Sequence, residues 1–444
     1  MPKAPFAWEP GDEVLVSAGG LGVVGMLLNS LPLGGQLNAS IIPGVEDPEI
    51  SHRDVVASYL GLLAQGKNDF DHVDAFRADD FFAVSLGLAR VPSSPTLRQR
   101  LDQAAGAAGA PWKVALLGGS DELLRRHARC TPLRLQGQDY VPLDIDVSPF
   151  DNGKTKKEGV SRTYKGCDGF APIFGYLGQE GWALGAELRE GKQHSDTPAF
   201  LKDCLTRAER ILPEAHLLVR LDSGNDSSDN IDICTAHGAA FLIKRNLRKE
   251  RLEDWLDRAK REGEAQTPRP GKTVYLGSCE LAPKQGHAPV RVAYEVIERT
   301  ITAKGEHLLL PEIEVASYWT SLPHTPLEVL RCYRDHGTME QYHSEYKTDM
   351  DLERLPSGKF ATNQLILQMA VLTFNILRIM GQATIGDPAV PLRKEAQRRR
   401  IRTVIQNLII CAAKLVRHAR RLRVRYARAN PWGIVLGHLY DAFA

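Results

Sequence analysis

Two aspartates lie on one short segment that is predicted to be a core strand. Residues 141–150 read VPLDIDVSPF, in which apolar residues alternate with Asp144 and Asp146. In a strand, the two carboxylates therefore point to one face and the apolar side chains to the other. Two carboxylates on a core strand are costly unless water, a cationic partner or a metal ion stabilises them. The segment therefore predicts an acidic site that is solvated, ion-paired or bound to a cation.

A third aspartate follows a second apolar strand. In AHLLVRLDSGND, a predicted strand runs into Asp222, and Ser223 and Gly224 then indicate a turn. The carboxyl end of a core strand is a usual place for a catalytic residue in such sheets. A carboxylate at this position can equally cap the helix that follows, so both interpretations stay open.

A predicted helix further along carries several polar side chains on one stripe. Its sequence, CYRDHGTMEQYHSEYK, occupies residues 332–347. At about 100° per residue, four side chains fall within roughly 60° of one another: Tyr333, His336, Glu340 and Lys347. A solvated helix shows such a stripe by chance fairly often, so the spacing alone does not identify a site.

The elements that must position these residues follow from the periodicity of the chain. Up to about residue 132, apolar residues recur at helical spacing, for example over 54–67, 79–91 and 94–106. From about residue 139 the order is strand-strand-strand-helix-strand-helix-strand. This order predicts a mixed α/β (α+β) fold with helices on the faces of a mixed sheet, rather than a doubly wound parallel sheet.

We expect five regions along the chain. In order, they are a helical N-terminal region, the first part of the core, a strand-rich insertion, the second part of the core with the helix that bears Glu340, and a basic helical C-terminal region. Their predicted bounds are 1–132, 133–262, 263–322, 323–382 and 383–444.

Two segments are strongly basic although the formal net charge is only +2. The loop DNGKTKKEGVSRTYKG, residues 151–166, carries Lys154, Lys156, Lys157, Arg162 and Lys165. Residues 393–429 hold many Lys and Arg but a single acid, and an apolar stripe there predicts a packed helix. Each segment can be a solvated surface or a phosphate-binding surface.

A composition of 43% hydrophobic and 25% charged residues is typical of a soluble globular protein. A length of 444 residues predicts more than one domain. The 7 cysteines are scattered and never spaced as C-x2-C, which indicates reduced thiols in a cytoplasmic protein and argues against a zinc finger. We expect no signal peptide. The apolar stretch from Val14 is interrupted by glycines, Asn29 and Pro32, so it predicts a buried helix and no membrane span.

Two glycine motifs resemble nucleotide-binding sequences but lack the required context. Residues 20–25 read G-x-G-x-x-G, yet helices rather than a series of parallel strands follow them. Residues 152–155 read NGKT, but Ser148 occupies the position of the first P-loop glycine. Neither motif therefore predicts a nucleotide site.

The spacing Tyr333-x2-His336-x3-Glu340-x6-Lys347 resembles the Y-x2-R-x3-E-x6-K signature of bacterial insertion-sequence transposases of the DDE type. The blocks around the two strand acids are similar to the same family's first and second acid blocks, and the similarity extends over essentially the whole chain. The similarity is greatest to the branch called DDE group 1. The resemblance implies an RNase H-like catalytic domain with a strand-rich insertion before the third acid.

The resemblance also implies the catalytic acids. Asp146, Asp222 and Glu340 would be the metal ligands, and carboxylates suit hard cations such as Mg²⁺ or Mn²⁺. Asp146 is preferred as the first acid because the family's acid precedes a small or hydroxyl pair, and residues 147–148 read VS here. Asp144 stays an alternative.

DNA-binding residues are implied in the same way. Tyr333 and Lys347 would contact the phosphates of the transposon ends, together with the basic loop. His336 departs from the family's arginine, and histidine cannot make the bidentate phosphate contact of arginine. Trp319, at the end of the insertion, can stack on a displaced base or belong to the core.

Two metal ions about 4 Å apart can support in-line phosphoryl transfer, first with water and then with a 3′-hydroxyl as the attacking group. The resemblance thus implies a cut-and-paste transposase that acts on terminal inverted repeats and on target DNA, as a homodimer, in the bacterial cytoplasm. Two alternatives stay open: a metal-dependent nuclease that does not join strands, and a catalytically inactive DNA-binding descendant, for which His336 is the only indication.

Overall fold

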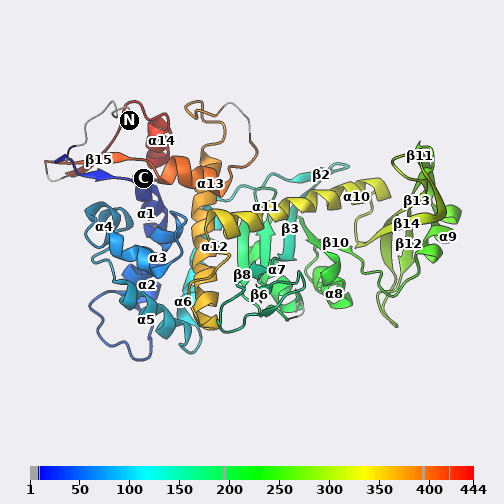
Figure 1. Cartoon of the computed structure of the whole chain (residues 1–444), viewed down its shortest axis with the longest axis horizontal. Helices are drawn as coiled ribbons and strands as arrows, with labels where there is room; N and C mark the ends of the chain where they lie inside the picture. The colour runs from blue at the N-terminus through cyan, green and yellow to red at the C-terminus, as the bar shows by residue number, and fades with distance from the viewer. Residues whose placement is uncertain (1–8, 10, 194–196, 393–395, 420) are drawn as a thin grey trace, which may run out of the picture. The chain divides into compact units, whose positions relative to one another are not determined.

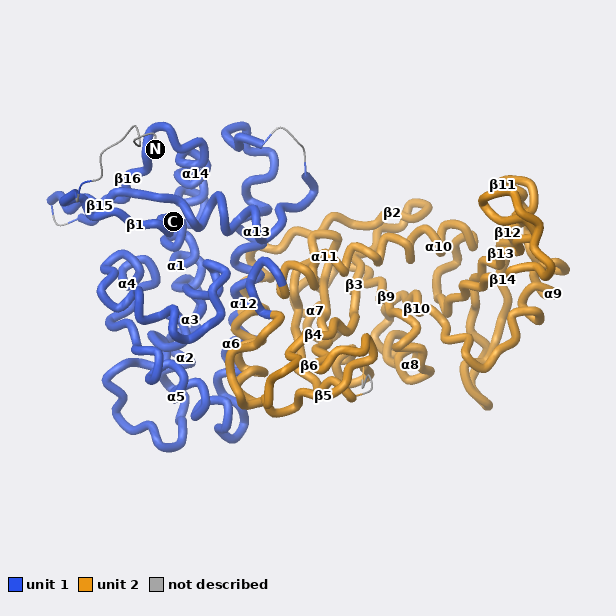
Figure 2. The backbone as a smooth tube through the Cα atoms, viewed as in Figure 1, with its two compact units in different colours: residues 1–119, 348–352, 372–444 blue, residues 120–347, 353–371 orange. Residues whose placement is uncertain are grey.

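The computed structural model describes residues 9, 11–193, 197–392, 396–419 and 421–444 of the chain. The chain folds as two compact units (Figure 1, Figure 2). Unit 1 contains residues 1–119, 348–352 and 372–444, and unit 2 contains residues 120–347 and 353–371. Most of the N-terminal and C-terminal regions therefore share one unit, and the core strands with their insertion form the other.

Five strands of unit 2 have the order β8-β7-β3-β9-β10. Their bounds, in that order, are Trp182–Glu187, Ile173–Leu177, Gln138–Val147, Leu217–Leu221 and Ala240–Lys244. β7 runs antiparallel to β3 and β8, whereas β9 is parallel to β3 and to β10. Helices α7 (Thr197–Ile211) and α8 (Ser228–Ala236) lie between these strands in the chain. The predicted mixed α/β fold is confirmed, and the strand order is that of an RNase H-like domain.

Helices cover both faces of this sheet. Successive residues of a strand point to opposite faces, so the contacts of neighbouring residues on β7 show which helix lies on each face. On β7, the rings of Phe174 and Tyr176 contact His343 of helix α11 (Met339–Ser344). Between them, Gly175 lies against Cys204 of α7. The helix that bears Glu340 therefore packs on one face of the core sheet, and α7 packs on the other.

The strand-rich insertion continues the core sheet. β14 (His307–Thr320) pairs antiparallel with β10. The next strands outward are β13 (Val290–Ile301), β12 (Lys272–Leu281) and β11 (Glu264–Arg269). Helices α9 (Leu252–Glu262) and α10 (Pro326–Arg334) both contact β12 and β13. The buried side chains where α10 packs include Leu218, Ala293, Tyr318 and Leu330.

Irregular turns flank α11 on both sides. The 3₁₀ helix η3 (Asp335–Thr338) joins it to α10, and the π-helix η4 (Glu345–Asp349) follows it. π-helical turns are rare and are frequent at functional sites. The remaining elements of unit 2 are β2 (Leu133–Leu135), which pairs with β3, and a small sheet of β4 (Phe150–Asp151), β6 (Asp168–Phe170) and β5 (Ser161–Arg162).

Unit 1 is mainly helical in its N-terminal part, as predicted. Its helices are α1 (Leu21–Asn29), α2 (Leu33–Asn38), α3 (His52–Leu63), η1 (Phe70–Phe76), α4 (Asp80–Leu86) and α5 (Ser94–Ala105). The next helix, α6 (Pro111–His127), continues into the sequence of unit 2. The apolar stretch from Val14 forms β1 (Leu15–Val16) and the largely buried α1, which confirms the prediction of a buried helix.

The G-x-G-x-x-G motif at the start of α1 serves packing. A Cβ at Gly20 would lie 1.8 Å from the carbonyl oxygen of Leu408, and one at Gly25 would lie 1.7 Å from that of Ser85. These contacts leave no room for a side chain, so glycine is required for close backbone approach.

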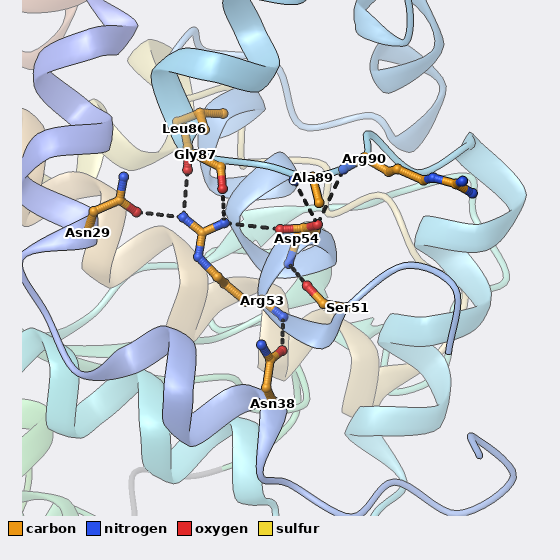
Figure 3. Close-up of polar contacts among 9 residues, drawn as sticks. All are labelled: Asn29, Asn38, Ser51, Arg53, Asp54, Leu86, Gly87, Ala89 and Arg90. Carbon is orange, nitrogen blue, oxygen red and sulfur yellow. Dashed lines mark hydrogen bonds and ion pairs between the residues drawn. The ribbon is translucent and has the colours of Figure 1, made fainter. Parts of the chain in front are cut away.

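Arg53 and Asp54 tie the N-terminal helices together (Figure 3). The Arg53 guanidinium donates to the side chain of Asn29, 2.6 Å away, and to the carbonyl oxygens of Leu86 and Gly87. Asp54, which is 3% exposed, accepts from the backbone N–H groups of residues 89 and 90. One buried carboxylate and one arginine thus satisfy the polar groups where α4 ends.

The basic C-terminal region contains a hairpin, so the prediction that it is helical is wrong for residues 413–418 and 421–426. β15 (Ala413–His418) and β16 (Arg421–Tyr426) pair with each other, and β15 also pairs with β1. Apolar and charged residues alternate along β16, and period-two alternation favours a strand. Helices α13 (Ile401–Val404) and η5 (Ile405–Ile409) precede the hairpin, and α14 (Gly433–Phe443) follows it. Residues 393–395 and 420 of the basic segment lie outside the described residues.

Among the described residues, one helix is long and apolar enough to cross a membrane by length and composition alone. This helix, α12 (Phe360–Ala383), has 94% of its apolar window buried inside the protein. Its buried polar residues include Asn363, Asn375 and Arg378. Such burial is typical of a core helix in a water-soluble fold.

Candidate active site

Asp144 is held in a buried ion pair. It lies directly opposite Arg220 in the parallel pairing of β3 with β9. Nε and Nη2 of Arg220 donate to the two carboxylate oxygens at 2.6 and 2.7 Å, and both side chains are 4% exposed. Nδ1 of His336 lies 3.1 Å from Oδ1 of Asp144. Burial disfavours the charged carboxylate, but Arg220 and then His336 outweigh it and hold the pKa of Asp144 below its ordinary value.

Asp146 and Asp222 converge at the ends of the same two strands. Ile145 of β3 pairs with Leu221 of β9, so the next residue on each strand is one of these aspartates. Burial, and then the charge of Asp222, raise the pKa of Asp146 to about 6. These two carboxylates at neighbouring strand ends form the acidic centre of the site.

Asp222 is oriented by the turn that follows it. Its carboxylate accepts from the backbone N–H of Gly224 at 3.1 Å and from the side chain of the buried Asn225 at 2.6 Å. The helix-cap interpretation of Asp222 is therefore correct for the short 3₁₀ helix η2 (Ser223–Asn225). These bonds hold one oxygen of Asp222, and the residue stays half-buried.

The helical segment that bears Glu340 packs against the aspartates. His336 precedes Glu340 by four residues and contacts Asp144, and Nδ1 of His343, three residues after it, lies 3.9 Å from Asp146. Glu340 lies between these two histidines in the chain, on the six-residue helix α11, whose buried residues are Met339, Tyr342 and His343. Its side chain is exposed, and in the described part of the chain Glu340 forms no hydrogen bond or ion pair.

The two aspartates fit a divalent cation, because paired carboxylate oxygens whose charges repel each other are the ligands that hard ions prefer. Burial first, and then this repulsion, raise the pKa of Asp146. Within the described residues, however, no group of three His, Cys, Asp or Glu side chains is placed to hold a metal ion. The convergence of Glu340 with the two aspartates therefore stays a prediction.

Cationic side chains lie near the acidic pair. Lys165, which is exposed, and Lys347, which is half-buried, both interact electrostatically with Asp146. The Lys347 ammonium lies 5.6 Å from the ring centre of Phe150. Tyr164 donates to the carbonyl oxygen of Val147, which places the neighbouring Lys165 beside the end of β3. Positive charge next to an acidic pair is suited to a phosphate group.

The other basic side chains of the loop at residues 151–166 differ in their exposure to solvent. Lys154 and Lys156 are exposed. Arg162 is exposed and lies 3.5 Å from Asp168. Lys157 is half-buried, and its ammonium donates to Asn152 at 3.1 Å and to the carbonyl oxygen of residue 355. Lys157 therefore forms structural hydrogen bonds within unit 2 and is not a free surface cation.

Two aromatic residues named from the sequence are packed. Tyr333 lies against Tyr318 and His336, and burial, followed by the charge of Asp222, raises its pKa well above the ordinary value. Trp319 is 4% exposed, and its indole N–H donates to Asp226 at 2.8 Å. Trp319 thus occupies a core position, which is one of the two interpretations left open by the sequence.

Sequence reasoning missed the residues that position the acids: Arg220, Asn225, Tyr164 and His343. Only Arg220 gave a signal, because a charged residue inside the apolar strand LLVRL requires a buried partner. The identity of that partner depends on the register of β3 with β9. His343 stays neutral at physiological pH because burial, together with Lys347 and His336, lowers its pKa to about 3.

A family model described as "Transposase DDE domain group 1" matches residues 10–444. The chain belongs to this transposase family. Membership assigns the protein to enzymes that act on DNA in DNA transposition. It also agrees with the resemblance seen around the three acids.

No curated protein sequence is significantly similar to this transposase. Among solved structures, the chain is similar to a piggyBac transposase seen by cryo-EM in a synaptic complex with hairpin DNA. That likeness has a TM-score of 0.42 at 9% sequence identity, over 89% of this chain and 80% of the other.

Proposed function

We propose that this transposase cuts DNA at the ends of a bacterial insertion sequence and joins the freed 3′-hydroxyl to target DNA, by a cut-and-paste route. The observation that carries the proposal is the pair Asp146 and Asp222 at the carboxyl ends of β3 and β9. Its chemistry suits the metal-dependent phosphoryl transfer that the family name implies.

Asp146, Asp222 and Glu340 would hold Mg²⁺ or Mn²⁺. When bound, such ions stabilise negative charge on the attacking and leaving oxygens of a phosphodiester. Asn225 fixes the orientation of Asp222, while the bond of Asp144 to Arg220 anchors β3 against β9. The irregular turns on both sides of α11 support a role for Glu340, because a six-residue helix between them can be adjusted when DNA binds.

DNA is the proposed partner, as terminal inverted repeats and as target. Lys165 and Lys347 would contact a phosphate next to the acidic pair, and Lys154, Lys156 and Arg162 would contact flanking phosphates. A homodimer would bring two ends together, and the bacterial cytoplasm is the proposed location.

His336 had been the one feature that favoured an inactive descendant. Its contact with Asp144 gives it a positioning role that does not need the charge of arginine. This observation supports an active enzyme. The other alternative, a nuclease that cuts without joining, differs in the fate of the 3′-hydroxyl.

A test uses the purified full chain with Mg²⁺ and labelled duplexes that carry the ends of the element. We expect both cleaved and joined products. Cleavage without joining indicates the nuclease, and binding alone indicates the inactive descendant; either result would contradict the proposal.

The third acid is tested by Glu340→Ala, with Asp335→Ala as a matched control, because both residues are exposed acids of the same helical segment. We expect Glu340→Ala to abolish cleavage while DNA binding is retained, and Asp335→Ala to cleave normally. If Glu340→Ala cuts as fast as the unmodified protein, Glu340 is not a ligand.

A further inference from the structure

The β15–β16 hairpin belongs to unit 1 (Figure 2), and its sequence and register give it one basic face and one apolar face. In its register, Lys414 lies opposite Arg425, Val416 opposite Arg423, and His418 opposite Arg421. Because side chains alternate along a strand, these six residues share one face. On the other face, Leu415 is buried, and the side chains of Leu422, Val424 and Tyr426 are half-buried. The apolar face packs on the unit, and the basic face points to solvent.

The charge of the basic face is largely unbalanced. Arg421, Arg423 and Arg425 are exposed, and in the described part of the chain they form no ion pair. Lys414 is the exception, because its ammonium lies 3.5 Å from Glu13. Like charges directly across two strands destabilise a sheet, and Lys414 faces Arg425 in this way. A polyanion laid on this face would remove the repulsion.

The spacing of the arginines suits a long anion. Residues two apart on a strand are about 7 Å apart, so three arginines form a row of about 14 Å. Duplex DNA carries a negative charge about every 1.7 Å of its axis, so such a row meets several phosphates at once.

We propose that this basic face is a second DNA-contacting surface, which binds the phosphate backbone of duplex DNA without reading its sequence. The inference rests on the proposed function, and it adds a binding surface that is separate from the acidic centre. β16 is the edge strand of its sheet, and arginines on an edge also discourage pairing with another chain. Edge protection is therefore the competing explanation.

The test measures binding of the full chain to a random-sequence duplex of 30 base pairs, by fluorescence anisotropy at several salt concentrations without divalent ions. For Arg421→Gln/Arg423→Gln/Arg425→Gln we expect at least a tenfold loss of affinity at low salt. The slope of log affinity against log salt should fall by about 3, because each lost phosphate contact removes about 0.9. A triple Lys variant should keep the slope.

Arg417→Gln is the matched control. Arg417 lies on the same hairpin, but it is opposite Leu422 on the other face and is paired with Asp80 at 2.8 Å. It should bind DNA like the unmodified protein. If the triple variant unfolds in a thermal melt, Arg423→Gln alone replaces it, with an expected slope change of about 1.

A triple Gln variant that binds DNA with the unmodified affinity and slope would overturn the inference, and the arginines would then serve the strand edge alone. That result leaves the proposed function intact if the unmodified protein joins DNA ends. A protein that binds no DNA at all would contradict both.

Discussion

Arg220 and Asp144 face each other across two parallel strands and form a bidentate ion pair inside the core of unit 2. This pair gives the two aspartates of β3 different surroundings. With Asp144 engaged by Arg220 and His336, Asp146 is the carboxylate left at the strand end beside Asp222. The preference for Asp146, which had rested on resemblance, thus has a structural reason.

The pair predicts a large loss of stability when one partner is removed. Arg220→Met leaves the Asp144 carboxylate buried without its cation, and such a change costs about 3–5 kcal/mol in the free energy of unfolding. Urea denaturation measures it. Arg162→Met is the control, because the exposed contact of Arg162 with Asp168 is worth less than about 1 kcal/mol. An equal loss of unfolding free energy in both variants would show that the buried ion pair stabilises the protein no more than the exposed one.

Replacing Asp146 should affect DNA cleavage, whereas replacing Asp144 should affect the stability of the fold. We expect Asp146→Asn to reduce DNA cleavage by on the order of a thousandfold, while the protein stays folded. Asp144→Asn should lower the melting temperature, because Arg220 loses its charged partner, and should keep cleavage per folded molecule within about tenfold. Cleavage assays below the melting temperature of both variants compare them. The reverse outcome would make Asp144 the first acid.

The raised pKa of Asp146 predicts a pH effect on the metal-free protein. The pKa of Asp146 is about 6 in the folded protein, whereas the ordinary pKa of an aspartate is 3.8. The carboxyl group therefore binds a proton more readily in the folded state. Its contribution to stability is therefore complete below about pH 4 and is lost as pH rises through 6, by up to about 3 kcal/mol.

Asp146→Asn removes this loss. In EDTA, the variant should gain stability relative to the unmodified protein between pH 4 and pH 7, as followed by thermal melting. A difference that does not change with pH would show that Asp146 is not perturbed.

Trp319 should matter for stability rather than for DNA processing. Its indole N–H bonds Asp226, and the Arg245 guanidinium lies 4.5 Å from its ring centre. Trp319→Phe removes the donor and part of the ring, so we expect a loss of about 1–3 kcal/mol with end joining retained at low temperature. Unchanged stability with loss of joining would restore the base-stacking role.

The sequence by itself determined the local elements and the kind of chemistry. The strand-strand-strand order from about residue 139 predicted β3, β7 and β8, and helical spacing predicted the N-terminal helices. The C-terminal basic segment carries apolar residues at both helical and strand spacing. We predicted a helix there, but residues 413–418 and 421–426 form strands. The pairing of β15 with β1, which lies about 400 residues away in the chain, favours the strand.

Only the tertiary structure decided which side chains meet. Asp144 and Asp146 have the same local pattern, and their different environments come from the register that puts Arg220 opposite one of them. The two histidines that contact β3 likewise depend on how the helical segment packs across the sheet. Periodicity fixes the face on which a side chain lies, whereas its partner depends on contacts between residues far apart in the chain, which no local pattern records.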